Sequence, residues 1–338
     1  MDPKLNEYTL SGPEADGIRA GIESLARSGA APKDPEFYEE NWQADTLLPS
    51  GVHEFLRRFR RSESGPVCVI HGFPVDDAQV GATPGHWREA LGVTSTRAHE
   101  TYMAMCAMAL GDPFTWSTLQ TGAMVQNLLP VRGDELLQNG YSSDAMLEFH
   151  TEDGFHPARC DYLILFGIRN PDAVPTFVAS VRDVKLEPMD RQMLSQPRFL
   201  IRPDDEHIRQ LRLIDPDHPS LAQAIAMKEN PRPVPVLFGD RMNPYLRVDR
   251  PFMQCVDQDR NAGRALDALM DELERVRESV TVGQGDLVIV DNYLAVHGRQ
   301  AFHSRYDGTD RWLKRMIVSR DLRRSAAYRD VNSSRVLF

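Results

Sequence analysis

Possible metal ligands are concentrated in one short segment, LEFHTEDGFHP, which spans residues 147–157. In an extended backbone, side chains two positions apart point to the same side, so His150 and Glu152 can hold one cation together. The triplet alone is a weak signal, because most polar loops that carry a His-x-Glu pattern are only solvated connections. A third ligand must come from another part of the chain.

Apolar strands are predicted around this segment. Directly after it, residues 161–168 form a continuous apolar run with the length and composition of a buried strand. Residues 234–238 and 245–248 predict two strands joined by a turn, and residues 287–290 predict a strand that ends shortly before His297. The candidate ligands therefore lie at the mouth of a sheet.

Helical patterns occur on both sides of the predicted strands. A capping box at Ser11 and Glu14 predicts an N-terminal helix, and apolar residues recur at helical spacing from Ala262 to Val276, which predicts a helix that covers a sheet. Further helices are predicted at residues 52–59 and 98–110, and further strands at residues 66–74, 124–130 and 311–318. Residues 132–145 predict a loop, and the polar, Pro-rich residues 204–235 predict a lid or insertion, with a plain surface excursion as the alternative.

The composition is that of an ordinary soluble globule with a substantial core. Hydrophobic residues make up 41% and charged residues 26% of the 338 residues, and no repeat or clean linker divides them, so we expect one domain, 1–338. The net charge of -10 argues against a nucleic-acid partner, which needs a basic surface. No export signal or long apolar run indicates a membrane, and four scattered cysteines fit free thiols, so we expect a cytoplasmic protein.

His297 is the candidate third ligand. It follows His150 by 147 residues, so it joins the set only if the fold brings the two segments together, as a β-barrel or jelly roll does. Two histidines and one carboxylate on one face of an octahedron leave three positions open, an arrangement that suits Fe(II) oxygenases, whereas Zn(II) more often takes four ligands. The pattern therefore favours non-haem iron.

A strand predicted at residues 311–318 places Arg311 and Arg315 on one face. Arginine presents a rigid fork that matches a carboxylate, so this pair could hold the carboxylates of a 2-oxo diacid and of an amino acid. The alternative is a surface strand whose charged residues point outward.

Several motifs together carry a family resemblance. They are PVDD (74–77), TPGHWR (83–88), HTEDGF (150–155), RFLIRPDD (198–205), DN (291–292), VHGR (296–299), RYDG (305–308) and DRWLKR (310–315). This set resembles the clavaminate synthase-like iron(II)/2-oxoglutarate oxygenases, and within them the group of the viomycin-type L-arginine β-hydroxylase and asparagine oxygenase. The resemblance implies a mainly β fold with flanking helices around a double-stranded β-helix (jelly roll, cupin-like) core at about residues 125–325, preceded by an N-terminal elaboration at about residues 1–125.

The resemblance also implies a chemistry and a set of roles. Fe(II) would be held by His150, Glu152 and His297, and the cosubstrate 2-oxoglutarate by Arg311, with dioxygen as the oxidant. Arg315 would meet the carboxylate of a small-molecule amino acid, Asp249 its polar end, and Glu152 its ammonium group. The implied reaction is hydroxylation of an unactivated Cβ or Cγ position in specialised-metabolite (antibiotic) biosynthesis, with arginine, citrulline or enduracididine as the expected substrate.

The chain departs from the family pattern at two places. Pro251 stands where the arginine hydroxylases carry a second aspartate, and Leu119 stands where relatives place a polar residue for the substrate amine, for which Gln120 could substitute. The Pro251 departure weakens the case for a guanidinium substrate. Other functions also stay open: a desaturase or cyclase, a hydroxylase of asparagine, of lysine or of a carrier-bound amino acid, and a metal-binding or carrier-docking module without catalysis.

Overall fold

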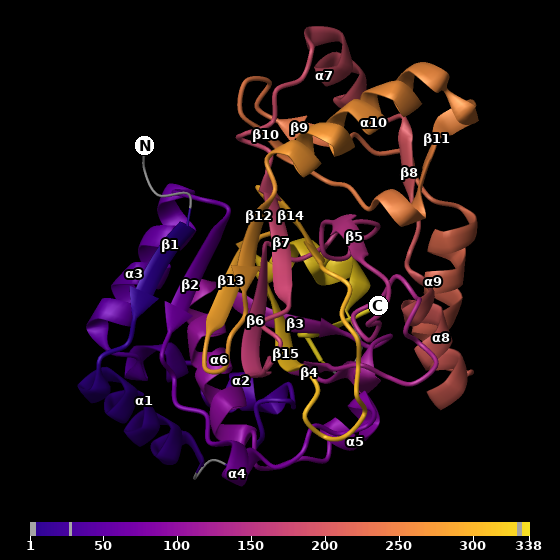
Figure 1. Ribbon diagram of the computed structural model, residues 1–338. Helices are drawn as coiled ribbons and strands as arrows, with labels where there is room; N and C mark the ends of the chain where they lie inside the picture. Colours follow the sequence, from indigo (N-terminus) through magenta and orange to yellow (C-terminus); the bar gives the residue numbers. More distant parts are fainter. Residues whose placement is uncertain (1–4, 27–28, 330–332) are drawn as a thin grey trace.

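Two sheets lie against each other at the centre of the molecule, and helices cover their outer faces (Figure 1). The computed structural model describes residues 5–26, 29–329 and 333–338. The described chain is a mixed α/β fold with several sheets, so the expectation of a mainly β fold with flanking helices is met in part.

The larger sheet has the strand order β1-β2-β13-β6-β15-β3-β16, and β4 also pairs with β15. Its strands are β1 (Leu5–Thr9), β2 (Val67–His71), β3 (Asp112–Trp116), β4 (Gln126–Leu128), β6 (Tyr162–Arg169), β13 (Leu287–Asp291), β15 (Trp312–Ser319) and β16 (Val336–Leu337). The apolar run predicted at residues 161–168 is confirmed as β6, which lies inside the sheet between β13 and β15. It is apolar at nearly every position because both of its faces are covered.

The smaller sheet has the order β12-β7-β14-β5. Its strands are β5 (Leu147–His150), β7 (Pro175–Ser180), β12 (Glu278–Thr281) and β14 (Ala295–Arg299). Ala295 and Val178 from this sheet pack in one buried cluster with Leu163 and Leu165 of the larger sheet, so the two inner faces meet there. Because strand side chains alternate, His297 lies on the same inner face as Ala295.

Helices cover the other face of each sheet. Ile164 and Phe166 of β6 pack in a cluster with residues of α1 (Gly12–Leu25), α3 (Ser50–Ser62) and α6 (Arg97–Leu110). Phe177 and Val296 of the smaller sheet pack with Leu266 and Leu269 of α10 (Arg260–Arg275), which confirms the sheet-covering helix predicted from its apolar face. The site-bearing strands are therefore held between two hydrophobic layers.

Shorter elements complete the described chain. The remaining helices are α2 (Glu36–Glu40), α4 (Asp77–Val80), α5 (Trp87–Ala90), α7 (Pro188–Leu194), α8 (Asp205–Ile214) and α9 (Pro219–Glu229). The 3-10 helices are η2 (Ala44–Leu47), η3 (Gln120–Gly122), η4 (Arg250–Phe252), η5 (Val256–Gln258) and η6 (Leu322–Tyr328). Two small sheets pair β9 (Leu237–Gly239) with β10 (Pro244–Leu246), and β8 (Phe199–Ile201) with β11 (Met253–Cys255).

The segment predicted as a lid or insertion is largely helical, which its sequence did not indicate. Residues 204–235 contain α8 and α9, which lie at the side of the molecule beside β5 (Figure 1). Asp204 caps α8, because its carboxylate accepts a hydrogen bond of 2.9 Å from the backbone N–H of Glu206. Pro219 occupies the first turn of α9, where a proline is tolerated.

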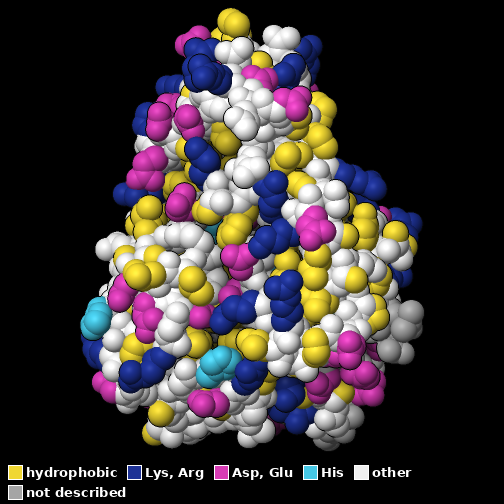
Figure 2. Space-filling view, turned by 90° about the vertical axis from the view of Figure 1, so that its right-hand side faces the viewer, with side chains coloured by type: hydrophobic (Ala, Val, Ile, Leu, Met, Phe, Trp, Pro, Cys, Tyr) yellow, Lys and Arg dark blue, Asp and Glu magenta, His cyan; other side chains and the backbone are white. Residues whose placement is uncertain are grey.

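The surface shows no extended basic region on the face in Figure 2, where Lys and Arg side chains are mixed with Asp and Glu side chains. Within the described residues, no helix combines the length and the apolar character needed to cross a membrane.

Gly167 of β6 provides a test of how closely the sheet packs. A Cβ atom placed on it would lie 1.8 Å from the backbone oxygen of Gly283, whereas a Cβ on Gly263 of α10 would meet no atom within 4 Å. We expect Gly167→Ala to lower the free energy of unfolding by roughly 2–4 kcal/mol, because backbone must move. Gly263→Ala should raise it by about 0.5–1 kcal/mol, as alanine favours a helix over glycine.

Urea titrations of the two variants measure both changes. Equal stability of Gly167→Ala and the parent protein would contradict the packing described for β6.

Candidate active site

The fold brings His150, Glu152 and His297 together between the two sheets. His150 ends β5, Glu152 lies in the turn that follows, and His297 lies in β14, directly opposite His150 in the antiparallel pair. One ligand atom from each residue lies within 4.8 Å of the others. The two histidines and one carboxylate suit Fe(II) with open coordination positions, so the residues fit the metal that the sequence indicates.

His150 is held in the form that binds a metal. Its Nδ1 lies 2.8 Å from the backbone oxygen of Glu148, so an Nδ1–H donates to that oxygen and leaves Nε2 for the metal. Burial lowers the pKa of His150 to about 4, and repulsion from His297 acts in the same direction. The imidazole is therefore neutral at pH 7.

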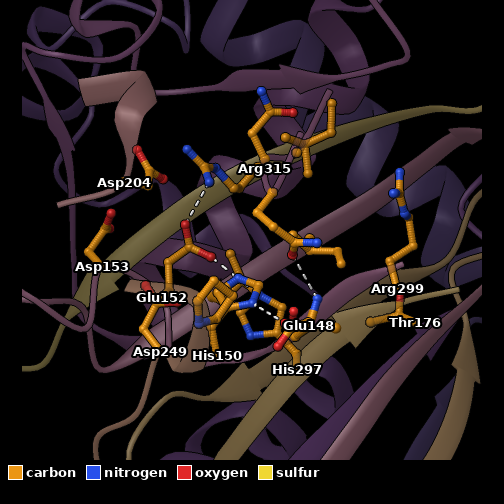
Figure 3. Close-up of a pocket in the computed structure, with 18 of the residues that line it drawn as sticks. Glu148, His150, Glu152, Asp153, Thr176, Asp204, Asp249, His297, Arg299 and Arg315 are labelled. Carbon is orange, nitrogen blue, oxygen red and sulfur yellow. Dashed lines mark hydrogen bonds and ion pairs between the residues drawn. The ribbon is translucent and has the colours of Figure 1, made fainter. Parts of the chain in front are cut away.

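Glu152 is oriented from two sides. Its Oε2 lies 3.3 Å from Nε2 of His297, and its Oε1 accepts a hydrogen bond of 2.6 Å from Nη1 of Arg315 (Figure 3). Burial acts to raise the pKa of Glu152, but the Arg315 guanidinium and His297 outweigh it and lower the pKa. One carboxylate oxygen thus faces the histidines while the other is held by Arg315.

Asn292 fixes the backbone that carries Glu152. Its Oδ1 accepts a hydrogen bond of 2.7 Å from the backbone N–H of Glu152. Its Nδ2 donates to the backbone oxygens of Glu152 and Cys160, each at 3.0 Å. Asn292 is fully buried. The sequence offered only the DN pair as a motif, with no role for its asparagine.

The ligand atoms border a cavity with an empty volume of about 880 Å³, including its opening to solvent. In Figure 3, Asp153, Asp204 and Asp249 lie on one side of the histidines, the Arg315 guanidinium bonded to Glu152 lies on that side too, and Arg299 lies on the other side. Arg311 lines the same cavity. A bound molecule would therefore meet both acidic and cationic groups.

Arg311 has the surroundings of a carboxylate-binding residue. It precedes β15 and is buried, and its Nε has no hydrogen-bond partner among the described residues. Burial lowers the pKa of Arg311 to about 9, and the charge of Arg299 adds to this effect. A buried guanidinium without a partner is costly, and a carboxylate with its two oxygens can compensate it.

Asp249 is a second buried ionisable residue of the cavity. It is buried, lies beside His150 through a backbone bridge, and its side chain accepts no hydrogen bond from a described residue. Burial raises the pKa of Asp249 well above its usual value, and the nearby Asp204 and Glu152 add to this effect. The sequence predicted Asp249 but not Asp204, whose only signal was its place in the RFLIRPDD motif.

Gln120 lies outside the residues that line the cavity. Its Nε2 donates to the backbone oxygen of Asn127 at 2.8 Å and to the Tyr141 hydroxyl at 3.0 Å. Its Oε1 accepts from the backbone N–H of Asn127. The amide is therefore already used within the protein, and substrate binding by Gln120 stays a prediction. Leu119 is buried in the core between the sheets, whereas Pro251 lines the cavity.

Comparison with known proteins yields a matching family model and relatives that align over most of the chain. The model, "Taurine catabolism dioxygenase TauD, TfdA family", matches residues 60–317. The chain is 38% identical to enduracididine beta-hydroxylase of Streptomyces hygroscopicus, over 97% of this chain and 98% of that protein. It is 37% identical to L-ornithine/L-arginine 3-hydroxylase of Catenulispora acidiphila, over 86% of this chain and 87% of that protein.

A solved relative has nearly the same fold. The crystal structure of the non-heme iron oxygenase OrfP with Fe, succinate and (3S)-hydroxy-L-Arg superimposes with a TM-score of 0.91, at 37% identity, and covers 98% of this chain and 99% of that chain. Another crystal structure of OrfP contains Fe and alpha-ketoglutaric acid. The His-Glu-His set of this chain thus occurs in the fold of an iron- and 2-oxoglutarate-binding protein.

The ligand set can be tested by metal binding alone. We expect His150→Ala to weaken anaerobic binding of Mn(II) or Co(II) by more than about 100-fold. Loss of a metal ligand should lower the affinity more than loss of a residue that only orients a ligand. Calorimetry measures the dissociation constants. His303→Ala serves as the control, because the His303 side chain is 89% exposed and lies outside the site. Unchanged metal affinity in His150→Ala would refute the assignment.

Proposed function

The chain belongs to the TauD/TfdA family of dioxygenases, and we propose that it hydroxylates Cβ or Cγ of a free amino acid with a guanidino or ureido side chain. It is a non-haem iron, 2-oxoglutarate-dependent oxygenase. Arginine, citrulline and enduracididine are the proposed substrates. We interpret the two facing sheets as the halves of a double-stranded β-helix, with residues 204–235 as a lid.

The observation that carries the proposal is the carboxylate of Asp249, buried in the cavity without a hydrogen-bond donor among the described residues. Asp204 and Asp153 line the same part of the cavity (Figure 3). A buried carboxylate of this kind needs a cation or strong donors beside it, and a guanidinium supplies both. Asp204 offers a further carboxylate where Pro251 removes one, whereas both oxygens of Asp153 already bond to Trp116 and His207.

The other residues receive roles from their positions. We assign His150, Glu152 and His297 to the iron, and Arg311 to the distal carboxylate of 2-oxoglutarate. Arg315 keeps free N–H groups beside Glu152 for the carboxylate of the amino acid. When bound, the iron, 2-oxoglutarate and dioxygen supply the oxidation: the C–H substrate, 2-oxoglutarate and O2 give the alcohol, succinate and carbon dioxide. The protein orients the substrate and excludes water.

The direct test is turnover with a panel of amino acids. The protein is loaded with Fe(II) and 2-oxoglutarate without oxygen, mixed with arginine, citrulline, enduracididine, asparagine or lysine, and exposed to air. We expect stoichiometric succinate and a product that gains one oxygen atom with a guanidino or ureido substrate. Loss of two hydrogens would instead indicate a desaturase or cyclase. Absence of succinate with every amino acid would refute the proposal.

The role of Asp249 can be tested by substrate charge. We expect Asp249→Asn to raise the KM for arginine at least about tenfold, because a charge-assisted pair with the guanidinium is lost. The KM for citrulline should change less, since its ureido group is neutral. Asp271→Asn, on the exposed face of α10, is the matched control. An equal loss for both substrates would contradict recognition of the cation by Asp249.

A further inference from the structure

Gln126 lies directly opposite Arg315 in the antiparallel pair of β4 and β15. Its Oε1 accepts a hydrogen bond of 3.0 Å from Nε of Arg315 and a second bond from Nη2 of the same guanidinium. Gln126 is buried and does not line the cavity. It therefore contacts Arg315 from the side that faces away from a bound molecule.

A second buried side chain sets the orientation of the Gln126 amide. The Thr115 hydroxyl donates its only proton to the Ala123 oxygen at 2.9 Å, so its oxygen can accept from Nε2 of Gln126 at 3.3 Å. The amide oxygen must then point toward Arg315. The Ala123 carbonyl, Thr115 and Gln126 form a chain of hydrogen bonds that ends on the guanidinium.

The guanidinium of Arg315 is thus held from two directions. Its Nε and Nη2 donate to Gln126, and its Nη1 donates to Glu152 at 2.6 Å. A guanidinium has five N–H groups, so two of them remain without a partner in the described chain. With Gln126 removed, Glu152 would be the remaining acceptor, and the guanidinium could turn about its bond to Glu152.

We propose that Gln126 is a positioning residue that presents Arg315 to the α-carboxylate of the amino acid substrate. This inference rests on the proposed function, because it needs an amino acid in the cavity. Gln126 itself touches neither substrate nor metal. Its effect is therefore confined to the carboxylate of the amino acid, while 2-oxoglutarate, assigned to Arg311, binds as before.

Gln126→Leu is the main variant, because leucine is similar in size and has no acceptor. In protein loaded with Mn(II) and 2-oxoglutarate, we expect L-arginine to bind roughly 10- to 100-fold more weakly, the range expected for losing a charge-assisted contact. L-argininamide, which has a neutral amide in place of the carboxylate, should bind the variant and the parent protein equally. The KM for 2-oxoglutarate should stay unchanged, while the KM for arginine rises more than kcat falls.

Three further comparisons keep the test decisive. Thr115→Val removes the acceptor that orients the amide, and we expect the same selective loss at smaller size. Gln79→Leu, at an exposed position in α4, is the control. In an Arg315→Leu background, Gln126→Leu should have no further effect on arginine binding.

The outcomes separate the two proposals. If the parent protein binds none of the amino acids in the panel, the proposed function fails and this inference fails with it. If the parent binds arginine and Gln126→Leu binds it equally tightly, or loses arginine and argininamide alike, only the role of Gln126 is overturned.

Discussion

The antiparallel pairing of β5 with β14 is the constraint on which the rest of the site depends. It sets His150 opposite His297, although 147 residues separate them in the chain. The alternation of β14 then directs His297 to the space between the sheets, while Val296 packs toward α10. A slip of one residue would exchange these two directions, so the apolar packing of Val296 protects the position of the metal ligand.

Within the part of the chain that the structure describes, the cavity carries ionisable groups that are incompletely paired. Arg311 and Asp249 are both buried, and burial lowers the pKa of the first and raises the pKa of the second. Such groups reduce the stability of the free protein, because a desolvated charge without a partner is unfavourable. A ligand that brings an opposite charge to each of these groups offsets the unfavourable free energy of the buried charge. Ligand binding and the stability of the fold are therefore coupled here.

Much of the fold could be predicted from the sequence because its signals are local. The strand β6 and the helices α6 and α10 lie close to their predicted ranges, since apolar runs and helical spacing act within one element. The helices α8 and α9 were not predicted, because the polar, Pro-rich residues 204–235 show no clear apolar periodicity. Asp204 is the cap of α8, and Ile208 and Leu211 of α8 pack in a small apolar cluster with Leu221 and Ala224 of α9.

Sequence spacing predicted that His150 pairs with Glu152 and that Arg311 pairs with Arg315, because side chains two positions apart in a strand share a face. All four side chains line the cavity, although Glu152 lies in the turn after β5 and Arg311 precedes β15. Three relations required the folded chain: His297 lies with His150 and Glu152, Asp204 lines the same cavity as Asp249, and Gln126 bonds to Arg315. These relations depend on strand pairing and on packing between the sheets, which bring together segments far apart in the chain. A local sequence pattern does not show which distant segments will meet.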